Sequence, residues 1–350
     1  MRLPVRLPFA LPAALLLASL CAAAQPAPAA EVKTTRVLTR ESVIARFADA
    51  QSKFVDVDGV NLHYKDEGSG PPILLMQGTL GDLADWDGWA EQLARRHRVL
   101  RFDMPAFGLS GPLRSGNYSA DRMLSLIDAF MDQMGVERFA IAGTSYGGLV
   151  AFRYAATRTD RITALILANS AGVEYGKRPA QIATASLPVP QAGPATAPAP
   201  AAASTPAGEA RANIFNDPVI TAADVEVNLR HVLANPALVT PLMVERKLAF
   251  TNMQGRLEES LAGRRLYERG DPLRVLAHVR APALVLWGAA NKALDPKTAD
   301  AFVQALKNAC SAERIVYGDA GHLLIVDKAA QSAADAMAFL ERNTTCRSKT

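Results

Sequence analysis

The sequence predicts an α/β protein in which a mostly parallel sheet is flanked by helices and interrupted by a helical insertion. Short apolar runs alternate with amphipathic segments of about 10–15 residues, which is the pattern of strand–helix–strand crossovers. This alternation stops after residue 171 and resumes at residue 281. Residues 172–280 therefore form an insertion within one sheet.

The first part of the sheet domain, residues 54–171, begins with a predicted hairpin. Residues 54–68 read as two strands joined at Asp58-Gly59, a hairpin turn signal. The continuously apolar run 71–78 suits a strand buried on both faces. A helix over 119–135 has Ser119 as N-cap and Gly135 as its stop. Further strands are predicted at 98–105, 138–143 and 162–170, and further helices at 86–97 and 146–158.

The insertion and the second part of the sheet domain differ in composition. Residues 185–210 are a Pro/Ala-rich tract, which we expect to be an extended tether. Residues 219–268 read as two or three amphipathic helices. The sheet pattern returns in the second part, residues 281–350. Its elements are a strand at 281–288, a helix from Pro296, a strand at 314–318 and a last helix near 328–342.

Residues 1–24 have the features of a secretory signal peptide. Arg2 and Arg6 give a positive start, Leu7 to Leu20 is apolar but short for a bilayer span, and three alanines precede Gln25. We therefore expect a periplasmic or secreted protein with no stable membrane insertion after the signal is removed. Residues 25–53 read as a polar N-terminal extension.

The composition argues against several classes of function. The net charge of +4 becomes +2 when the signal takes its two arginines, and no basic stripe with interleaved aromatics is present, so nucleic acid is not an expected partner. The histidines are scattered without ligand spacing, so no metal is expected. No phosphate- or dinucleotide-binding glycine loop is present, so no cofactor is expected. A small-molecule substrate is the expected partner, and the sequence leaves the oligomeric state open.

Two cysteines remain after removal of the signal, Cys310 and Cys346. An oxidising compartment permits a disulfide between them, and two free thiols are the alternative.

The strongest catalytic signal is Gly143-Thr144-Ser145-Tyr146-Gly147, which matches G-x-S-x-G between a predicted buried strand and a helix. Such a serine sits on a strained turn, and the glycines let the strand and helix pack closely around it. Ser145 is therefore a candidate nucleophile, and the Tyr146 amide at the helix N-terminus is a candidate oxyanion donor. The alternative is a glycine-rich turn with a surface serine.

The other catalytic groups are sought after neighbouring strands. The Thr79 amide, in the turn after strand 71–78, could supply a second oxyanion donor, although Gly78 could equally be a plain strand end. A serine also needs a base. His322 follows the last strand in a glycine-flanked loop, and the carboxyl ends of parallel strands lie at one edge of the sheet, so His322 can meet Ser145.

These residues resemble the α/β-hydrolase fold superfamily. The resemblance covers about residues 54–171 and 281–342 and makes residues 172–280 a helical cap. It rests on G-T-S-Y-G-G, on A-G-H at His322 and on RFDMPAFGLSGP, which is similar to D-x-P-G-x-G-x-S with Ala106 in place of a glycine. The resemblance implies a catalytic triad in the order Ser145, acid, His322, a structural role for Asp103 and a packing role for Trp86.

Two departures from the family pattern bear on activity. Gln77 stands where the family usually has histidine, and Asn291 stands in the alternative acid position, where the family commonly reads W-G-x-x-D. The acid holds the histidine in the right tautomer and stabilises its charged form; asparagine can orient the ring but not stabilise the charge. We predict Asp295 as the acid, although Asp295-Pro296 is also a helix-capping signal.

Two functions follow. The first is a serine hydrolase, with a small carboxylic ester as substrate and acyl-enzyme chemistry. The alternative is a binding or regulatory protein on the same scaffold with weakened catalysis, suggested by the joint departures at Gln77 and Asn291.

Overall fold

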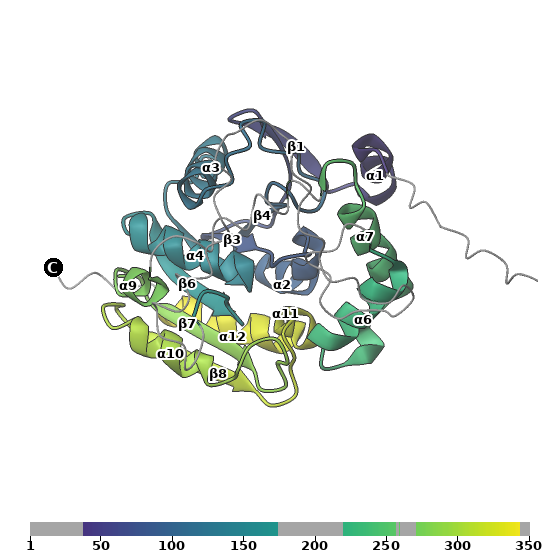
Figure 1. The fold of residues 1–350 in the computed structure, drawn as a ribbon. Helices are drawn as coiled ribbons and strands as arrows, with labels where there is room; N and C mark the ends of the chain where they lie inside the picture. Colours follow the sequence, from purple (N-terminus) through teal and green to yellow (C-terminus); the bar gives the residue numbers. More distant parts are fainter. Residues whose placement is uncertain (1–37, 174–219, 257–258, 260–270, 344–350) are drawn as a thin grey trace, which may run out of the picture. The chain divides into compact units, whose positions relative to one another are not determined.

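The computed structural model describes residues 38–173, 220–256, 259 and 271–343, which all belong to one compact unit spanning Arg36–Thr350. Its centre is a sheet of eight strands in the order β1-β2-β4-β3-β5-β6-β7-β8 (Figure 1). The β1–β2 and β2–β4 pairs are antiparallel, and the other pairs are parallel. The strands are β1 Lys53–Val57, β2 Val60–Glu67, β3 Pro72–Met76, β4 Arg98–Phe102, β5 Phe139–Thr144, β6 Ile162–Ala168, β7 Ala283–Gly288 and β8 Ala312–Tyr317. The predicted mostly parallel sheet is confirmed.

Helices cover both faces of the sheet because the strands alternate their side chains between two cores. Along β3, Leu74 and Met76 face one core while Ile73 and Leu75 face the other. The first core packs against α3 (Ala120–Gln133), α4 (Tyr146–Thr157), α9 (Pro272–Leu276) and α10 (Thr298–Ala305). The second packs against η1 (Leu83–Trp86), α2 (Asp87–Leu93), α11 (Leu324–Asp327) and α12 (Ala329–Arg342).

Local signals place several of these elements as predicted. Asp58 and Gly59 both adopt positive φ in the β1–β2 hairpin, at 50° and 79°. The Ser119 hydroxyl accepts a hydrogen bond from the Arg122 amide and so caps α3. Gly135 follows that helix with φ of 68°, the left-handed conformation that favours glycine.

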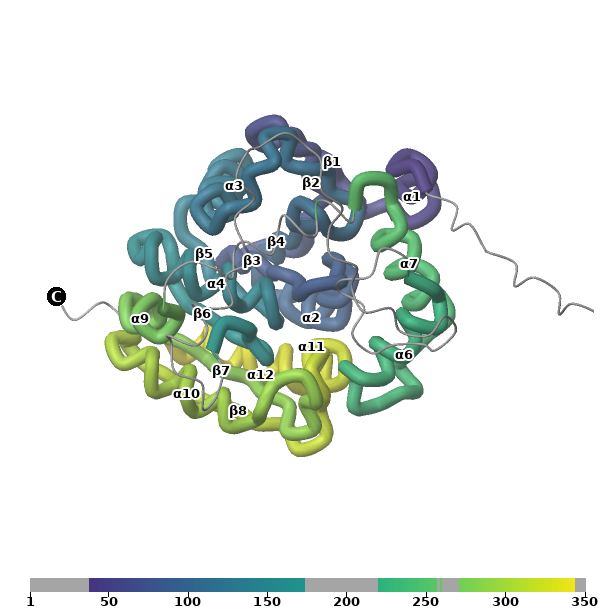
Figure 2. The backbone as a smooth tube through the Cα atoms, viewed as in Figure 1, coloured from purple at the N-terminus to yellow at the C-terminus, as the bar shows by residue number. Residues whose placement is uncertain are grey.

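Two helices, α6 (Ala222–Val232) and α7 (Pro241–Thr251), lie between β6 and β7 in the chain, with η2 (Pro236–Leu238) connecting them. We call α6 and α7 the inserted helices. They pack against each other, and α7 packs against α1 (Arg40–Phe47), as Figures 1 and 2 show for the green and purple helices. Helix α1 lies in the segment expected to be a polar extension; Thr39 caps it, and Val43 packs against Phe250 and Met253.

Several predicted features lie outside the described residues: the signal peptide, the Pro/Ala tract 185–210 and Cys346. Cys310 is disulfide-bonded, and its partner also lies outside them. Among the described residues, no helix is both long enough and apolar enough to cross a membrane.

Candidate active site

Ser145 lies in a strained turn between β5 and α4. Its backbone has φ of 50° and ψ of −117°, a conformation that L-residues rarely adopt. The turn is tight because its glycines leave room for backbone. A methyl group on Gly147 would lie 2.2 Å from the Met76 carbonyl oxygen, and one on Gly143 would lie 2.3 Å from the Gly147 carbonyl oxygen. The structure therefore places Ser145 at the carboxyl edge of the sheet in the predicted geometry.

The turn after β3 adjoins this serine. A methyl group on Gly78 would lie 3.0 Å from Ser145 Cβ. Thr79 is the next residue, and the Gly81 amide closes the turn by donating to the Gly78 carbonyl at 3.0 Å. The structure thus brings together Ser145, Thr79 and Tyr146, the first residue of α4. We call residues 77–81 the oxyanion loop.

Gln77 stands in place of the family's histidine, and both polar atoms of its side-chain amide are hydrogen-bonded. Its side chain is fully buried. With its amide oriented to suit both neighbours, the nitrogen donates to the Phe102 carbonyl at 3.1 Å and the oxygen accepts from the Met104 amide at 2.8 Å. Gln77 therefore fastens the start of the oxyanion loop to the end of β4.

Asn169 connects the two predicted catalytic residues. Its carbonyl oxygen accepts from the Ser145 amide at 3.2 Å, and its Nδ2 donates to the His322 carbonyl oxygen at 2.7 Å. The same Nδ2 donates to the Gly321 carbonyl at 2.9 Å, and its Oδ1 accepts from the Gly288 amide at 3.0 Å. Asn169 was not among the predicted site residues. In the structure it connects β6 and β7 to residues 318–323, the loop after β8 that carries His322. We call this segment the histidine loop.

The His322 side chain is half-buried. Burial, with a smaller contribution from the neighbouring His231, lowers the pKa of His322 to about 4 from its ordinary 6.5. Its Nδ1 atom is buried and has no hydrogen-bond partner among the described residues. The ring is therefore neutral at physiological pH, and no described carboxylate stabilises its charged form.

Asp295 does not lie against His322 in this structure. Its side chain is exposed, and its Oδ1 accepts from the Lys297 amide at 2.8 Å. Asp295 thus closes the turn before α10, which begins at Thr298 with Lys297 as its N-cap, and the predicted pairing with His322 is absent.

Asn291 lies in the turn after β7, where the family commonly has its catalytic acid. The Ala290 amide, next to it, donates to the Ala320 carbonyl at 3.0 Å, so this turn adjoins the histidine loop. The Asn291 side chain is buried, and its Oδ1 accepts from the amides of Ala293 and Leu294 at 2.9 and 3.0 Å. These two donors fix the amide orientation and leave Nδ2, which is buried and has no described partner.

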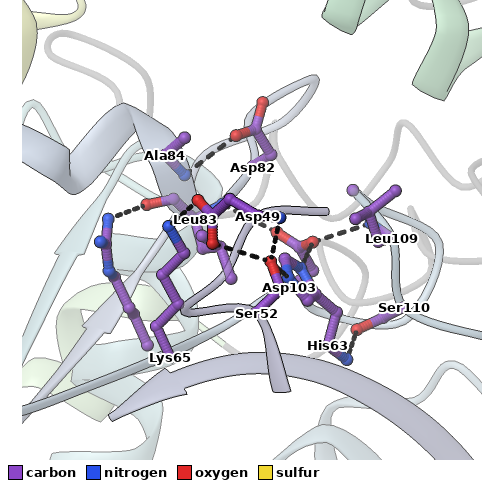
Figure 3. Close-up of polar contacts among 12 residues, drawn as sticks. Asp49, Ser52, His63, Lys65, Asp82, Leu83, Ala84, Asp103, Leu109 and Ser110 are labelled. Atoms are coloured by element: carbon purple, nitrogen blue, oxygen red, sulfur yellow. Dashed lines mark hydrogen bonds and ion pairs between the residues drawn. The ribbon is translucent and has the colours of Figure 1, made fainter. Parts of the chain in front are cut away.

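A complete Ser–His–Asp arrangement lies away from Ser145, beside the β1–β2 hairpin (Figure 3). His63 Nδ1 lies 2.7 Å from Asp103 Oδ2, and His63 Nε2 lies 2.8 Å from Ser52 Oγ. Asp103 also accepts from the Leu83 and Leu109 amides, both at 2.7 Å. Its carboxylate therefore holds two loops together, as its structural assignment predicts. His63 is buried in this network.

Comparison with known proteins identifies the family. A family model for the alpha/beta hydrolase fold matches residues 71–329. The chain therefore belongs to the α/β-hydrolase fold family.

The curated relatives include several kinds of enzyme. The chain is 25% identical over 291 residues to the dihydrolipoyllysine-residue acetyltransferase component of the acetoin cleaving system of Cupriavidus necator, covering 81% of this chain and 67% of that protein. It is 32% identical over 120 residues to haloalkane dehalogenase 2 of Mycobacterium tuberculosis, covering 34% and 42%. It is 28% identical over 120 residues to 2-hydroxymuconate semialdehyde hydrolase of a Pseudomonas species, covering 33% and 42%. The chain thus spans under half the length of the two hydrolases.

Solved structures share the fold. A bacterial membrane phospholipase A superposes with a TM-score of 0.66 at 24% identity, covering 84% of this chain and 86% of that chain. The enol-lactonase from Burkholderia xenovorans superposes with a TM-score of 0.63 at 20% identity, covering 83% and 100%.

Proposed function

We propose that this chain is a serine hydrolase that cleaves a small carboxylic ester through an acyl-enzyme, with Ser145 as nucleophile and His322 as base. One observation carries the proposal: Asn169 is hydrogen-bonded to the backbone of both residues while Ser145 lies in a strained turn beside the oxyanion loop. Serine on such a turn, with a histidine from the loop after the last strand, is the arrangement of acyl-transfer catalysis in this fold.

The chemistry follows from these positions. Ser145 Oγ attacks the ester carbonyl carbon as its proton passes to His322 Nε2, and the amides of Thr79 and Tyr146 bind the oxyanion. Collapse of the tetrahedral intermediate expels the alcohol, which takes the proton from His322. Water then attacks the acyl-enzyme with His322 again as base and releases the carboxylic acid.

Asn291 sets the rate of this reaction. An aspartate in its place would accept a hydrogen bond from the Nδ1–H group and stabilise the imidazolium that forms as Ser145 loses its proton. The Asn291 oxygen is instead taken by the Ala293 and Leu294 amides. A base with a pKa of about 4 and no carboxylate partner is weak. We therefore expect a functional but slow enzyme.

The second candidate is a binding protein on the same scaffold. The low pKa of His322 and its unpaired Nδ1 favour this alternative. Both are expected of a neutral polar group that lines a binding site, and neither is expected of a strong base. In that case Ser145 and His322 would contact a ligand without reacting.

We also propose that the protein acts outside the cytoplasm. The disulfide at Cys310 supports this location, because such bonds persist in oxidising compartments and are rare in the cytosol. Exported and cytoplasmic fractions of cells producing the full chain would be compared for a protein that has lost residues 1–24. Retention of the whole chain in the cytoplasm would contradict the proposal.

Labelling by a fluorophosphonate probe tests the catalytic proposal. We expect wild-type protein to label and Ser145→Ala to lose labelling. Ser52→Ala is the matched control, since Ser52 belongs to the complete Ser–His–Asp arrangement at the hairpin; it should label like wild type. Hydrolysis of p-nitrophenyl acetate should follow the same order. Absence of wild-type labelling under conditions that label a known esterase would favour the binding protein.

A further inference from the structure

A buried cation from an inserted helix reaches the oxyanion loop. Lys247, on α7, donates from Nζ to Asp85 Oδ1 and Oδ2 at 2.9 and 3.0 Å, and to the Leu80 carbonyl oxygen at 3.2 Å. Its Nζ also lies 3.6 Å from Asp82 Oδ2. Leu80 belongs to the oxyanion loop, Asp82 follows the loop directly, and Asp85 lies in η1.

The three charged side chains of this cluster are buried. Lys247, Asp82 and Asp85 are 6%, 3% and 4% exposed. Burial alone would lower the pKa of Lys247, but the two carboxyl groups raise it above its ordinary value, so the lysine is charged. A buried ammonium group is stable only with its partners in place, which makes the contact with Leu80 a fixed one.

The inserted helices also contact Leu80 through its apolar side chain, independently of the hydrogen bond from Lys247. Its backbone has φ of 58°, which is strained for a leucine. Its side chain packs into the apolar cluster of Ile220, Val225 and Leu229, which Met243 and Leu248 also join. Apolar packing thus holds the side chain while Lys247 holds the carbonyl oxygen.

Thr79 lies between two anchored carbonyl groups. The Gly78 carbonyl accepts from the Gly81 amide at 3.0 Å, and the Leu80 carbonyl accepts from Lys247. The Thr79 amide shares a peptide plane with the Gly78 carbonyl, and the Leu80 contact holds the chain that follows Thr79. We propose that Lys247 is a positioning residue for the oxyanion hole, so that the inserted helices help to set its geometry. This inference rests on the proposed function, because the oxyanion hole matters only if Ser145 forms a tetrahedral intermediate.

Substitution of Lys247 tests the inference. Lys247→Met should lower kcat on p-nitrophenyl acetate about 10²-fold, because a displaced donor stabilises the transition state poorly. KM should change by less than about twofold, since ground-state binding does not use the hole. Asp85→Asn keeps an amide oxygen for the lysine and leaves Asp82 as its charged partner, so the contact with Leu80 should persist and kcat should fall much less. The double variant Asp85→Asn/Lys247→Met leaves no unpaired charge on Asp85 and should lose as much kcat as Lys247→Met, even if the single variant folds poorly.

Hydrogen exchange supplies a readout that needs no activity. Amides of residues 77–82 should exchange faster in the double variant than in wild type, while those of β7 remain unchanged. The matched control is Glu226→Gln, which breaks only an exposed ion pair with Arg230 on α6 and should alter neither readout. Unchanged exchange in 77–82, or a KM effect without a kcat effect, would overturn the inference. An inactive wild type whose exchange responds as expected would instead overturn the proposed function and leave Lys247 as the anchor of the loop.

Discussion

The side-chain amide of Asn169 donates to the main-chain carbonyl oxygen of His322 at 2.7 Å. The Asn169 carbonyl oxygen also accepts from the Ser145 amide at 3.2 Å. A single residue at the end of β6 thus fixes the backbones of nucleophile and base, which come from strands on either side of it. Asparagine suits this position because its φ is 43° and asparagine tolerates the left-handed region better than most residues.

Removing this side chain should loosen the histidine loop. Asn169→Gly keeps the backbone conformation accessible but leaves the Gly288 amide and the Gly321 and His322 carbonyls without their partner. We expect a loss of about 1–3 kcal/mol in the free energy of unfolding, measured in urea, and slower labelling of Ser145. Asn308→Gly is the control, because that exposed amide donates to a single carbonyl, Ala277; equal losses in the two variants would contradict the assignment.

Gly147 should not tolerate even a methyl group. Alanine normally stabilises a helix relative to glycine, but here its methyl would meet the Met76 and Gln77 carbonyl oxygens at 2.2 and 2.5 Å. We expect Gly147→Ala to lower the free energy of unfolding by about 1–3 kcal/mol, and Gly318→Ala, where a methyl meets nothing within 4 Å, to stay within about 0.5 kcal/mol. Thermal melts of both variants give the comparison, and a stabilised Gly147→Ala would refute the close packing.

Replacing Ala106 with the glycine common in the family should raise the free energy of unfolding. Its φ of 74° is strained for alanine and free for glycine. Because glycine also loses more entropy on folding, we expect a net stabilisation by Ala106→Gly of only about 0.5 kcal/mol. Ala129→Gly, inside α3, should instead destabilise by about 1 kcal/mol. If calorimetry showed that both variants change the free energy of unfolding in the same direction, the role of backbone strain at Ala106 would be contradicted.

His322 should make stability depend on pH. Its folded pKa of about 4 lies below the ordinary 6.5, so between these values the unfolded chain binds more protons than the folded one. The contribution of the neutral ring is complete above pH 6.5 and is lost as the pH falls toward 4. Subtracting the pH profile of His322→Gln from that of wild type isolates this group. A difference that stays flat across the window would show that folding does not lower the pKa of His322.

Much of the fold could be predicted from local pattern. Alternating strands and helices, the Asp58-Gly59 turn and the Ser119 cap each depend on neighbouring residues, and the structure reproduces them. Ser145 was recognisable for the same reason, since its turn is encoded by adjacent glycines. Helix α1 was not, because its apolar face is short and is stabilised by α7, far away in sequence.

The missed parts of the site depend on distant contacts. Lys247 lies in an amphipathic helix with nothing nearby to mark it, and its carboxylate partners are more than 160 residues away. His63 looks unremarkable alone and joins the Asp103 network only when β2 and β4 pair. Asp295 was favoured because it is the nearest acid in sequence, yet its side chain is exposed and accepts from the Lys297 amide in the turn before α10.

Restoring the missing carboxylate should accelerate the enzyme. Asn291→Asp keeps an oxygen for the Ala293 and Leu294 amides and supplies a second one that can accept from His322 Nδ1. Because the reverse change in a serine protease lowers turnover about 10⁴-fold, we expect a gain of about 10²–10⁴-fold. The pKa of His322 should also rise from about 4, moving the acidic limb of the rate profile upward.

The rate of fluorophosphonate labelling of Asn291→Asp, relative to wild type, is the most direct measurement of this account. Asn308→Asp controls for an added surface charge, and Asp295→Ala tests the acid that sequence alone favoured. We predict faster labelling in Asn291→Asp, loss of that labelling when Ser145→Ala is added, and no change in the two controls. Unchanged labelling in Asn291→Asp, together with a large loss in Asp295→Ala, would contradict the account by placing the acid at Asp295 after all.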